Sequence, residues 1–204
     1  MRLRSPLFVA CLALAACTLA ACPGDDNDDG TTKPSLDTLF PADNQAPGWT
    51  REPSPAEFSP ALQLATTGAA VVGYIDGAAD PYLATAGQGG FVAWGRAMYT
   101  DGTRRLELQI WELADSAKTK AVYDAMMTNS SFLEYPPPTW TDVAGIGEAA
   151  RVANDNTLAW WFGARKGAYY FAGYTKMANP TVALDQAAKD AGEAFMKVVA
   201  SKLP

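Results

Sequence analysis

Two strand-like runs joined by Asp101-Gly102 constrain the fold of this chain more than any other feature of its sequence. The runs cover residues 91–100 and 103–113, and both are rich in aromatic and aliphatic side chains. An Asp-Gly pair between two such runs is a strong local signal for a β-hairpin, because both residues tolerate the positive φ of a tight turn. The sequence therefore predicts an antiparallel hairpin in which Thr100 faces Thr103.

A second hairpin and several helical segments complete the expected fold. Residues 157–164 and 168–175 flank Lys166-Gly167, which predicts another turn. Helices are expected in part of residues 62–83, from the N-cap Asp115 to about Thr128, and after Asn179-Pro180, with a short strand over residues 148–153. This order indicates an α+β domain: an antiparallel β-sheet of two hairpins, plus a possible extra strand, with α-helices packed on one face and a C-terminal helix.

Side-chain alternation assigns the two faces of the first hairpin. One face pairs small residues with large aliphatic ones, which is typical of a core covered by a helix. Its members are Ala93, Gly95 and Ala97 against Leu106, Leu108 and Ile110. The other face carries Val92, Trp94, Arg96 and Met98 against Arg105, Glu107, Gln109 and Trp111. Arg96 opposite Glu107 makes a cross-strand charge pair, which is expected in or near water.

The second hairpin extends this mixed face into a candidate ligand-binding surface. With Arg165 opposite Ala168, Leu158, Trp160, Phe162, Tyr169 and Phe171 share the core face, and three further rings share the other. Flat aromatic area beside planar hydrogen-bonding groups is typical of ligand and partner surfaces. The candidate site residues are Trp94, Arg96, Gln109, Trp111, Trp161, Tyr170 and Tyr174. The alternative is that a helix or loop, such as residues 36–60, covers this face and the rings only pack.

The first 22 residues have the pattern of a bacterial lipoprotein signal. A basic start, Met1-Arg2-Leu3-Arg4, precedes the apolar residues 7–19, a stretch shorter than a membrane-spanning helix. Leu19-Ala20-Ala21-Cys22 resembles a lipobox, whose cysteine thiol takes the lipid. Leu14-Ala15-Ala16-Cys17 is an alternative that would shorten the apolar stretch further, and an ordinary cleaved secretory signal is another. Loss of palmitate labelling on Cys22→Ser would place the lipid at Cys22, whereas loss on Cys17→Ser would move it.

The chain is thereby divided into a signal, a tether and one domain. Residues 1–21 are expected to be the lipoprotein signal peptide, and residues 22–35 the lipidated cysteine with an acidic, flexible tether. Residues 36–204 are expected to form a single α+β domain. The acyl chains would hold this domain on a membrane of the bacterial cell envelope, facing the periplasm or the cell surface.

Composition excludes several function classes. All three cysteines lie in the first 22 residues, so the domain has no disulfide, thiolate nucleophile or cysteine-ligated metal. The chain contains no histidine, which removes the usual general base and the commonest zinc ligand. A net charge of −6 argues against nucleic acid as a partner, because phosphate binding needs clustered Lys and Arg. We therefore expect no metal, no cofactor and no catalytic residue that can be named.

Three blocks of sequence resemble an uncharacterised bacterial family of unknown function. They are Phe40-Pro41 with Pro47-Gly48-Trp49, then Tyr74-Ile75-Asp76-Gly77-Ala78-Ala79-Asp80-Pro81-Tyr82-Leu83, and later Gly145-Ile146-Gly147-Glu148-Ala149. The family signature is a Gly-Trp followed by a Tyr-Ile-Asp-Gly-Ala-Ala-acid-x-Tyr-Leu block. The chain departs from it at Val71-Val72 and at Pro81. The resemblance implies an envelope protein and brings no catalytic residue with it.

Asp76 and Asp80 form a possible carboxylate pair. On a continuous helix they would lie one turn apart, close enough for acid–base or metal chemistry. The adjacent Gly77 and Pro81 favour a turn instead, in which an aspartate caps a helix.

Three functions remain open at this point. The favoured one is a lipid-anchored, non-catalytic domain that binds a small molecule, a glycan or an envelope protein through the aromatic face. The second is a structural subunit of an envelope assembly, which needs a flat apolar patch. The third is a hydrolase that depends on Asp or Glu, which needs a concave pocket holding acids of shifted pKa.

Overall fold

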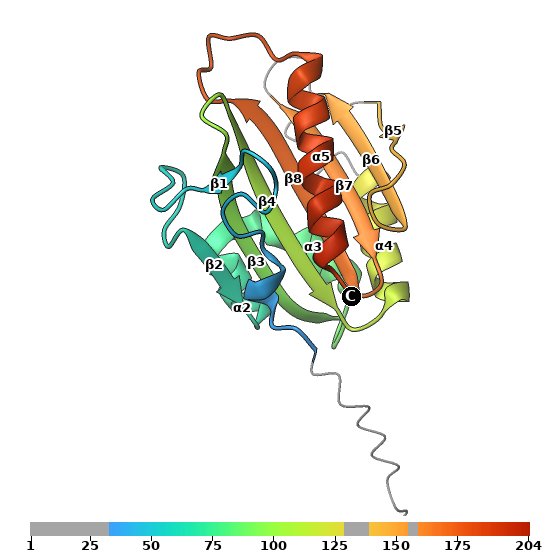
Figure 1. Cartoon of the computed structure of the whole chain (residues 1–204). Helices are drawn as coiled ribbons and strands as arrows, with labels where there is room; N and C mark the ends of the chain where they lie inside the picture. The colour runs from blue at the N-terminus through green and yellow to red at the C-terminus, as the bar shows by residue number, and fades with distance from the viewer. Residues whose placement is uncertain (1–32, 129–138, 155–158) are drawn as a thin grey trace, which may run out of the picture. The chain divides into compact units, whose positions relative to one another are not determined.

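The computed structural model describes residues 33–128, 139–154 and 159–204 (Figure 1). The signal segment, Cys22 and the tether up to residue 32 lie outside this described part, as does Leu158. Pro34–Pro204 forms a compact unit. Among the described residues, no helix has both the length and the apolar character needed to cross a membrane.

An antiparallel eight-stranded sheet forms the centre of the described structure (Figure 1). Its strands are β1 (Thr50–Arg51), β2 (Leu62–Ala65), β3 (Phe91–Thr100), β4 (Arg104–Leu113), β5 (Thr141–Asp142), β6 (Ala149–Asn154), β7 (Trp160–Lys166) and β8 (Tyr169–Met177). The order is β1-β3-β4-β8-β7-β6-β5, and β2 also pairs with β3. The two predicted hairpins are therefore neighbours, joined by the β4–β8 pairing. The α+β class and the antiparallel sheet are confirmed, and β6 corresponds to the extra strand expected over residues 148–153. The short strands β1, β2 and β5 are additions to the predicted sheet.

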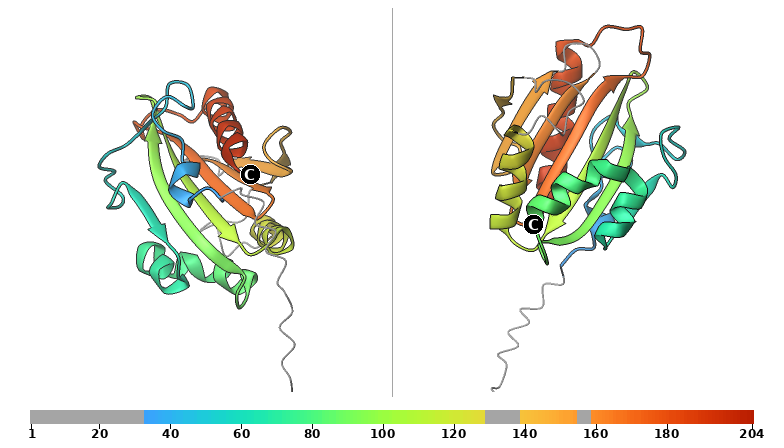
Figure 2. Two further views of the ribbon diagram at one scale, coloured as in Figure 1. Left: turned by 60° about the horizontal axis from the view of Figure 1, so that its bottom comes forward. Right: turned by 180° about the vertical axis from the view of Figure 1, so that it is seen from behind.

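Helices cover both faces of the sheet, so the expectation of helices on one face is wrong (Figure 2). The helices are α1 (Leu36–Leu39), α2 (Gly68–Ile75), the 3-10 helix η1 (Asp76–Ala79), α3 (Asp80–Ala86), α4 (Ser116–Thr128) and α5 (Gln186–Lys202). Side chains of α1 and α5 pack on one face, and those of α2, α3 and α4 pack on the other. The physical reason is that large apolar side chains project from both faces of the central strands, and each set needs a cover.

The helix ends follow local capping chemistry. Asp115 caps α4 as expected, since its Oδ1 accepts a hydrogen bond from the Lys118 amide at 2.8 Å. The last helix starts later than Asn179-Pro180, because Asp185 is its N-cap and accepts from the Ala188 amide at 2.8 Å. Asn179 instead closes a separate turn by accepting hydrogen bonds from Thr181.

Both hairpins pair two residues away from the expected register. Thr100 faces Arg105, and Lys166 faces Tyr169. In each turn the glycine occupies the first loop position, with φ of +87° at Gly102 and +52° at Gly167. A glycine at the first loop position is typical of a type II′ turn, which moves the centre of the turn by one residue. Cross-strand partners change by two residues, so every side chain keeps its predicted face.

Two hydrophobic clusters lie on opposite faces of the sheet. The first joins aliphatic residues of β4, such as Leu108, to Phe195 and Met196 of α5. The second joins Trp94 and Trp111 of the sheet to residues of α2 and α4. The first cluster also takes in residues of the 36–60 segment, including Phe40 and Trp49. This segment therefore packs mainly on the face opposite the candidate site. Helices α2, α3 and α4 cover part of the candidate face instead, so the alternative raised above holds for that part, with other elements as the cover.

Candidate functional site

The candidate face consists of three cross-strand rows on β3, β4, β8 and β7. The first row is Met98, Glu107, Tyr174 and Trp161; the second is Arg96, Gln109, Ala172 and Gly163; the third is Trp94, Trp111, Tyr170 and Arg165. The side chains of the middle row project less from the sheet than those of the outer rows, because two of its members have a small side chain or none. The two outer rows carry large rings, so the sheet itself forms a trough between them.

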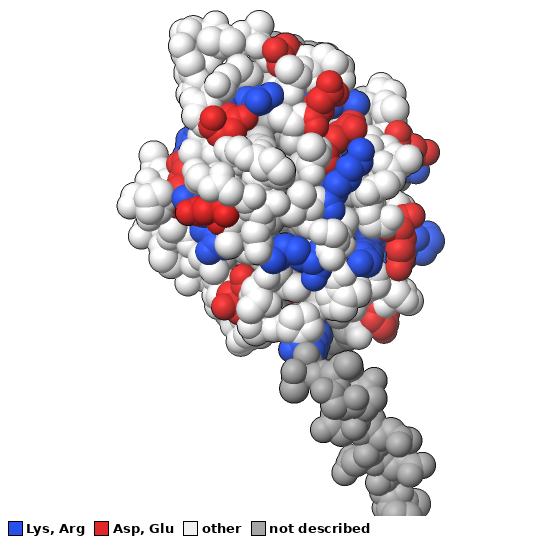
Figure 3. Space-filling model, in the orientation of Figure 1, with Lys and Arg blue, Asp and Glu red and all other residues white. Residues whose placement is uncertain are grey.

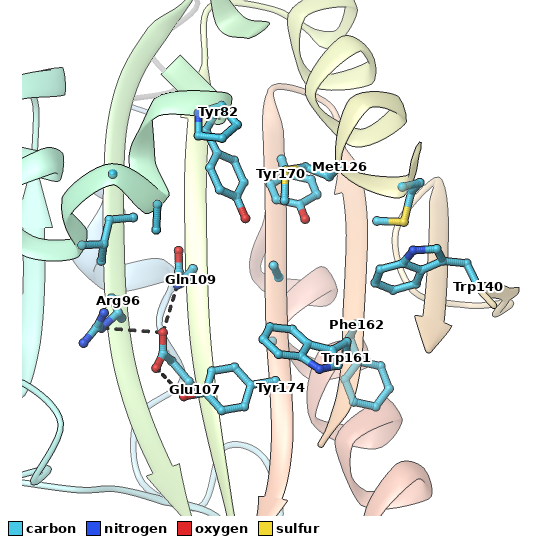
Figure 4. A pocket seen from close by; sticks show the side chains of 17 residues that line it. Tyr82, Arg96, Glu107, Gln109, Met126, Trp140, Trp161, Phe162, Tyr170 and Tyr174 are labelled. Carbon is cyan, nitrogen blue, oxygen red and sulfur yellow. Dashed lines mark hydrogen bonds and ion pairs between the residues drawn. The ribbon is translucent and has the colours of Figure 1, made fainter. Parts of the chain in front are cut away.

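A cavity of about 500 Å³ lies over this trough (Figure 4). Its floor includes three members of the middle row, Arg96, Gln109 and Ala172, and Trp161 and Tyr174 form one wall. Tyr82 of α3 forms part of the opposite wall, and Met126 of α4 and Trp140 close a third side. We refer to this space as the aromatic cavity. A volume of this size falls in the usual range for small-molecule sites.

A buried carboxylate, Glu107, lies in the wall of the aromatic cavity. Glu107 is 5% exposed, and it accepts hydrogen bonds from Gln109 Nε2 and from the Tyr174 hydroxyl, both at 2.9 Å. Arg96 Nε lies 3.7 Å from Glu107 Oε1. The predicted wet, directly opposed Arg96–Glu107 pair is wrong, because Met98 faces Glu107 and the two charges meet diagonally in a buried site.

The guanidinium of Arg96 is held from its other side by Phe58. It lies 3.8 Å from the centre of the Phe58 ring, an arrangement that favours a cation over an aromatic face. Residues 52–58 are fixed there by ion pairs, since Arg105 binds both Glu52 and Glu57 and Lys176 binds Glu57 at 3.0 Å. This segment therefore positions one charged corner of the aromatic cavity.

The Arg105 hydrogen bond and the nearby Lys176 lower the pKa of Glu57 to about 2, although desolvation opposes them. A lowered folded-state pKa stabilises the protein above the unfolded value near 4.5, and this stabilisation is lost as pH falls toward 2. Because Glu57 is partly exposed, we expect Glu57→Gln to cost about 1 kcal/mol of unfolding free energy at pH 7. The gap to the wild type should close below pH 3 in urea titrations. Exposed Asp80→Asn is the control, and an equal gap at both pH values would contradict the pairing.

Three tyrosines around the aromatic cavity stay protonated at neutral pH. Burial is the main cause that raises the pKa of Tyr82 and of Tyr170, whose phenols share a hydrogen bond. Burial and the negative charge of Glu107 raise the pKa of Tyr174. These phenols therefore act as hydrogen-bonding and aromatic groups at neutral pH, and none of them is a base.

Five of the seven predicted site residues line the aromatic cavity: Arg96, Gln109, Trp161, Tyr170 and Tyr174. Trp94 and Trp111 have exposed fractions of 0%, so their rings pack inside the protein and do not line the aromatic cavity. The ring of Tyr82 stacks on Trp111 with centroids 4.2 Å apart and an interplanar angle of 8°. Tyr74 stacks on Trp94 at 5.9 Å. Helices α2 and α3 thus cover this end of the face.

Sequence reasoning missed several residues of the cavity wall, namely Tyr82, Met126 and Trp140, and it placed Glu107 on this face without assigning it to the site. The first three come from helices and a loop, and their distance from the sheet depends on tertiary packing. The sequence around Tyr82 gave no local indication that the Tyr82 ring would contact Trp111.

Asp76 and Asp80 lie outside the aromatic cavity, and both are exposed. Asp76 ends α2 with φ of +51° and begins η1, and Asp80 begins α3. Among the described residues there is no group of three or more acidic, histidine or cysteine side chains that could hold a metal ion. The positions of the two aspartates at helix ends favour the structural interpretation.

The face that carries α5 offers a different surface. Figure 3 shows Lys and Arg side chains interspersed with Asp and Glu over this face. The i,i+4 pair Lys189–Glu193 on α5 is one source of this mixture. The aromatic cavity lies on the opposite face of the sheet and is the stronger candidate for a site.

Comparisons of the chain with protein-family models, with curated proteins and with solved structures find no match. The family resemblance therefore stays a prediction, and the function must be argued from the aromatic cavity.

Proposed function

We propose that this chain is a lipid-anchored binding protein of the bacterial cell envelope that holds a small molecule in the aromatic cavity. The observation that carries the proposal is a concave site of about 500 Å³ with ring-lined walls and one buried carboxylate. Sites with mostly apolar walls and a few fixed polar groups are typical of small-molecule binding. The lipobox predicted at Cys22 supports the envelope location.

The shape of the site favours a ligand over the two other functions considered. A subunit interface needs a flat apolar patch, whereas the outer rows of rings here enclose a trough. A hydrolase of the paired-carboxylate kind needs two acids across its substrate. Of the described residues that line the aromatic cavity, Glu107 is the sole acid, and its oxygens accept hydrogen bonds from Gln109 and Tyr174.

The proposal is tested by filling the floor of the cavity. Ala172 lies in the middle row, and Ala172→Leu adds bulk where a ligand would lie while keeping a side chain that strands accept. A thermal-shift panel of glycans, peptidoglycan fragments, lipids, metals and small metabolites should contain a compound that raises the midpoint of the wild type. At 100 times its Kd the rise should be roughly 5–10 °C.

We expect this rise to disappear in Ala172→Leu and to persist in Ala121→Leu, which adds the same atoms at an exposed position of α4. A rise of equal size in both variants would place the binding site elsewhere on the molecule. A panel with no active compound would contradict a small-molecule function and favour a protein partner.

A further inference from the structure

We propose that the aromatic cavity recognises a ligand through a quaternary ammonium group. This inference rests on the proposed binding function and adds the chemical class of the ligand. It follows from three properties of the cavity wall: its rings, the state of its polar groups, and the sign of its buried charge.

The rings come from separate elements and surround a common space (Figure 4). Trp161 and Tyr174 lie together, with ring centroids 4.9 Å apart. Trp140 and Tyr82 line other sides of the same space. The negative face of an aromatic ring attracts a cation, with Trp the strongest of these residues, and quaternary ammonium groups are bound in this way by sets of several rings.

The hydrogen-bond acceptors of the wall are engaged by its own donors, whereas two donors of the wall, Arg96 Nε and Trp140 Nε1, have no hydrogen-bond partner among the described residues. The Tyr174 hydroxyl and the Gln109 amide group donate to Glu107, and the Gln109 carbonyl accepts from Trp94 Nε1 at 3.3 Å. Tyr82 and Tyr170 share their own hydrogen bond. A primary ammonium carries three N–H donors, and Glu107, which already accepts two hydrogen bonds, has too few free acceptor positions for all three. Burying the remaining N–H groups without partners is costly. A quaternary ammonium has no N–H group and leaves this network intact.

The charge of Glu107 sets the preferred sign of the ligand. Tyr174 and Trp161 lie on the β8 and β7 side of Glu107, and Arg96 lies on its β3 side (Figure 4). The Arg96 guanidinium is drawn over the Phe58 ring, and Arg96 Nε is 3.7 Å from the carboxylate. The side of Glu107 that adjoins the rings therefore favours a cation, and the low exposure of Glu107 reduces the screening of its charge by solvent.

The test compares three probes that share a hydroxyethyl group, on the full chain, by calorimetry. Choline carries a quaternary ammonium, 3,3-dimethylbutan-1-ol has the same shape without the charge, and ethanolamine carries a primary ammonium. We expect choline to bind at least tenfold more tightly than either of the others. Glu107→Gln should weaken choline at least tenfold and change the affinity for the neutral alcohol less than twofold.

A second pair of variants guards against a folding defect in Glu107→Gln. Trp161→Leu removes a ring from the cavity, and Trp160→Leu removes the neighbouring ring, which packs toward the opposite face. Choline affinity should fall at least fivefold in Trp161→Leu and stay within twofold of the wild type in Trp160→Leu. Equal losses in the two variants would overturn the inference.

The outcomes separate this inference from the proposed function. If the neutral alcohol or ethanolamine binds as well as choline, the quaternary ammonium is not the recognised group. If choline does not bind but another panel compound loses its effect in Ala172→Leu, the binding function stands and this inference falls. If no compound depends on Ala172, both fall together.

Discussion

Replacing Trp111 by alanine is expected to lower the free energy of unfolding by about 4 kcal/mol, within the range measured for large-to-small changes of buried aromatic residues. The exposed fraction of Trp111 is 0%, and its ring stacks on Tyr82 and packs edge-on against Trp94. Its removal would leave a void between the sheet and α3. Urea denaturation followed by circular dichroism would measure the change.

Trp161→Ala is the matched comparison, because Trp161 is only half-buried and lines the aromatic cavity. We expect this variant to lose about 1 kcal/mol of stability, since much of its ring already faces the cavity. The two tryptophans were indistinguishable in the sequence as members of one aromatic face. Losses of similar size in both variants would contradict the division of this face into a packed end and an open end.

Gly192→Ala is expected to lower the free energy of unfolding by about 2 kcal/mol, although alanine is the better helix former. Gly192 lies where α5 packs closely on β7 and β8. A Cβ atom at this position would lie 2.5 Å from Phe162 Cε2 and 2.5 Å from Thr175 Oγ1. The helix would have to move away from β7 and β8, which would loosen the first hydrophobic cluster.

Gly73→Ala is the control for this prediction, because Gly73 lies inside α2 with no atom within 4 Å of the added Cβ. Here the ordinary helix preference should dominate, and stability should rise by about 0.5–1 kcal/mol. Thermal and urea unfolding of the two variants should therefore shift in opposite directions. A gain in both would mean that α5 does not pack as closely as described.

The faces of the sheet could be predicted because they depend on alternation alone. Leu106, Leu108 and Ile110 were assigned to one face and Trp161, Tyr170 and Tyr174 to the other, as the structure confirms. The turns were predicted one residue too early, since a loop can begin or end on its glycine. An error of this kind changes partners by two and leaves the face unchanged, which explains why the assignment of faces was robust.

The layer over the candidate face could not be predicted in the same way. Whether Trp111 is open or covered depends on how α3 returns over the sheet and brings Tyr82 onto it. No local sequence pattern determines how close α3 comes to the sheet. The diagonal contact of Arg96 with Glu107 likewise required the true register, since the predicted pairing placed them directly opposite.

The low middle row gives the site an unusual freedom to change during evolution. Ala172 belongs to the floor, and one nucleotide change turns an alanine codon into one for glycine, serine or valine. Each of these would deepen or fill the trough while leaving the strand register in place. At Gly163, its neighbour on β7, an added Cβ would lie 2.2 Å from Met127 Cε, so a larger residue there would first displace the flexible end of this α4 side chain. Descendants of one ancestral chain could therefore diverge in ligand size through a single position.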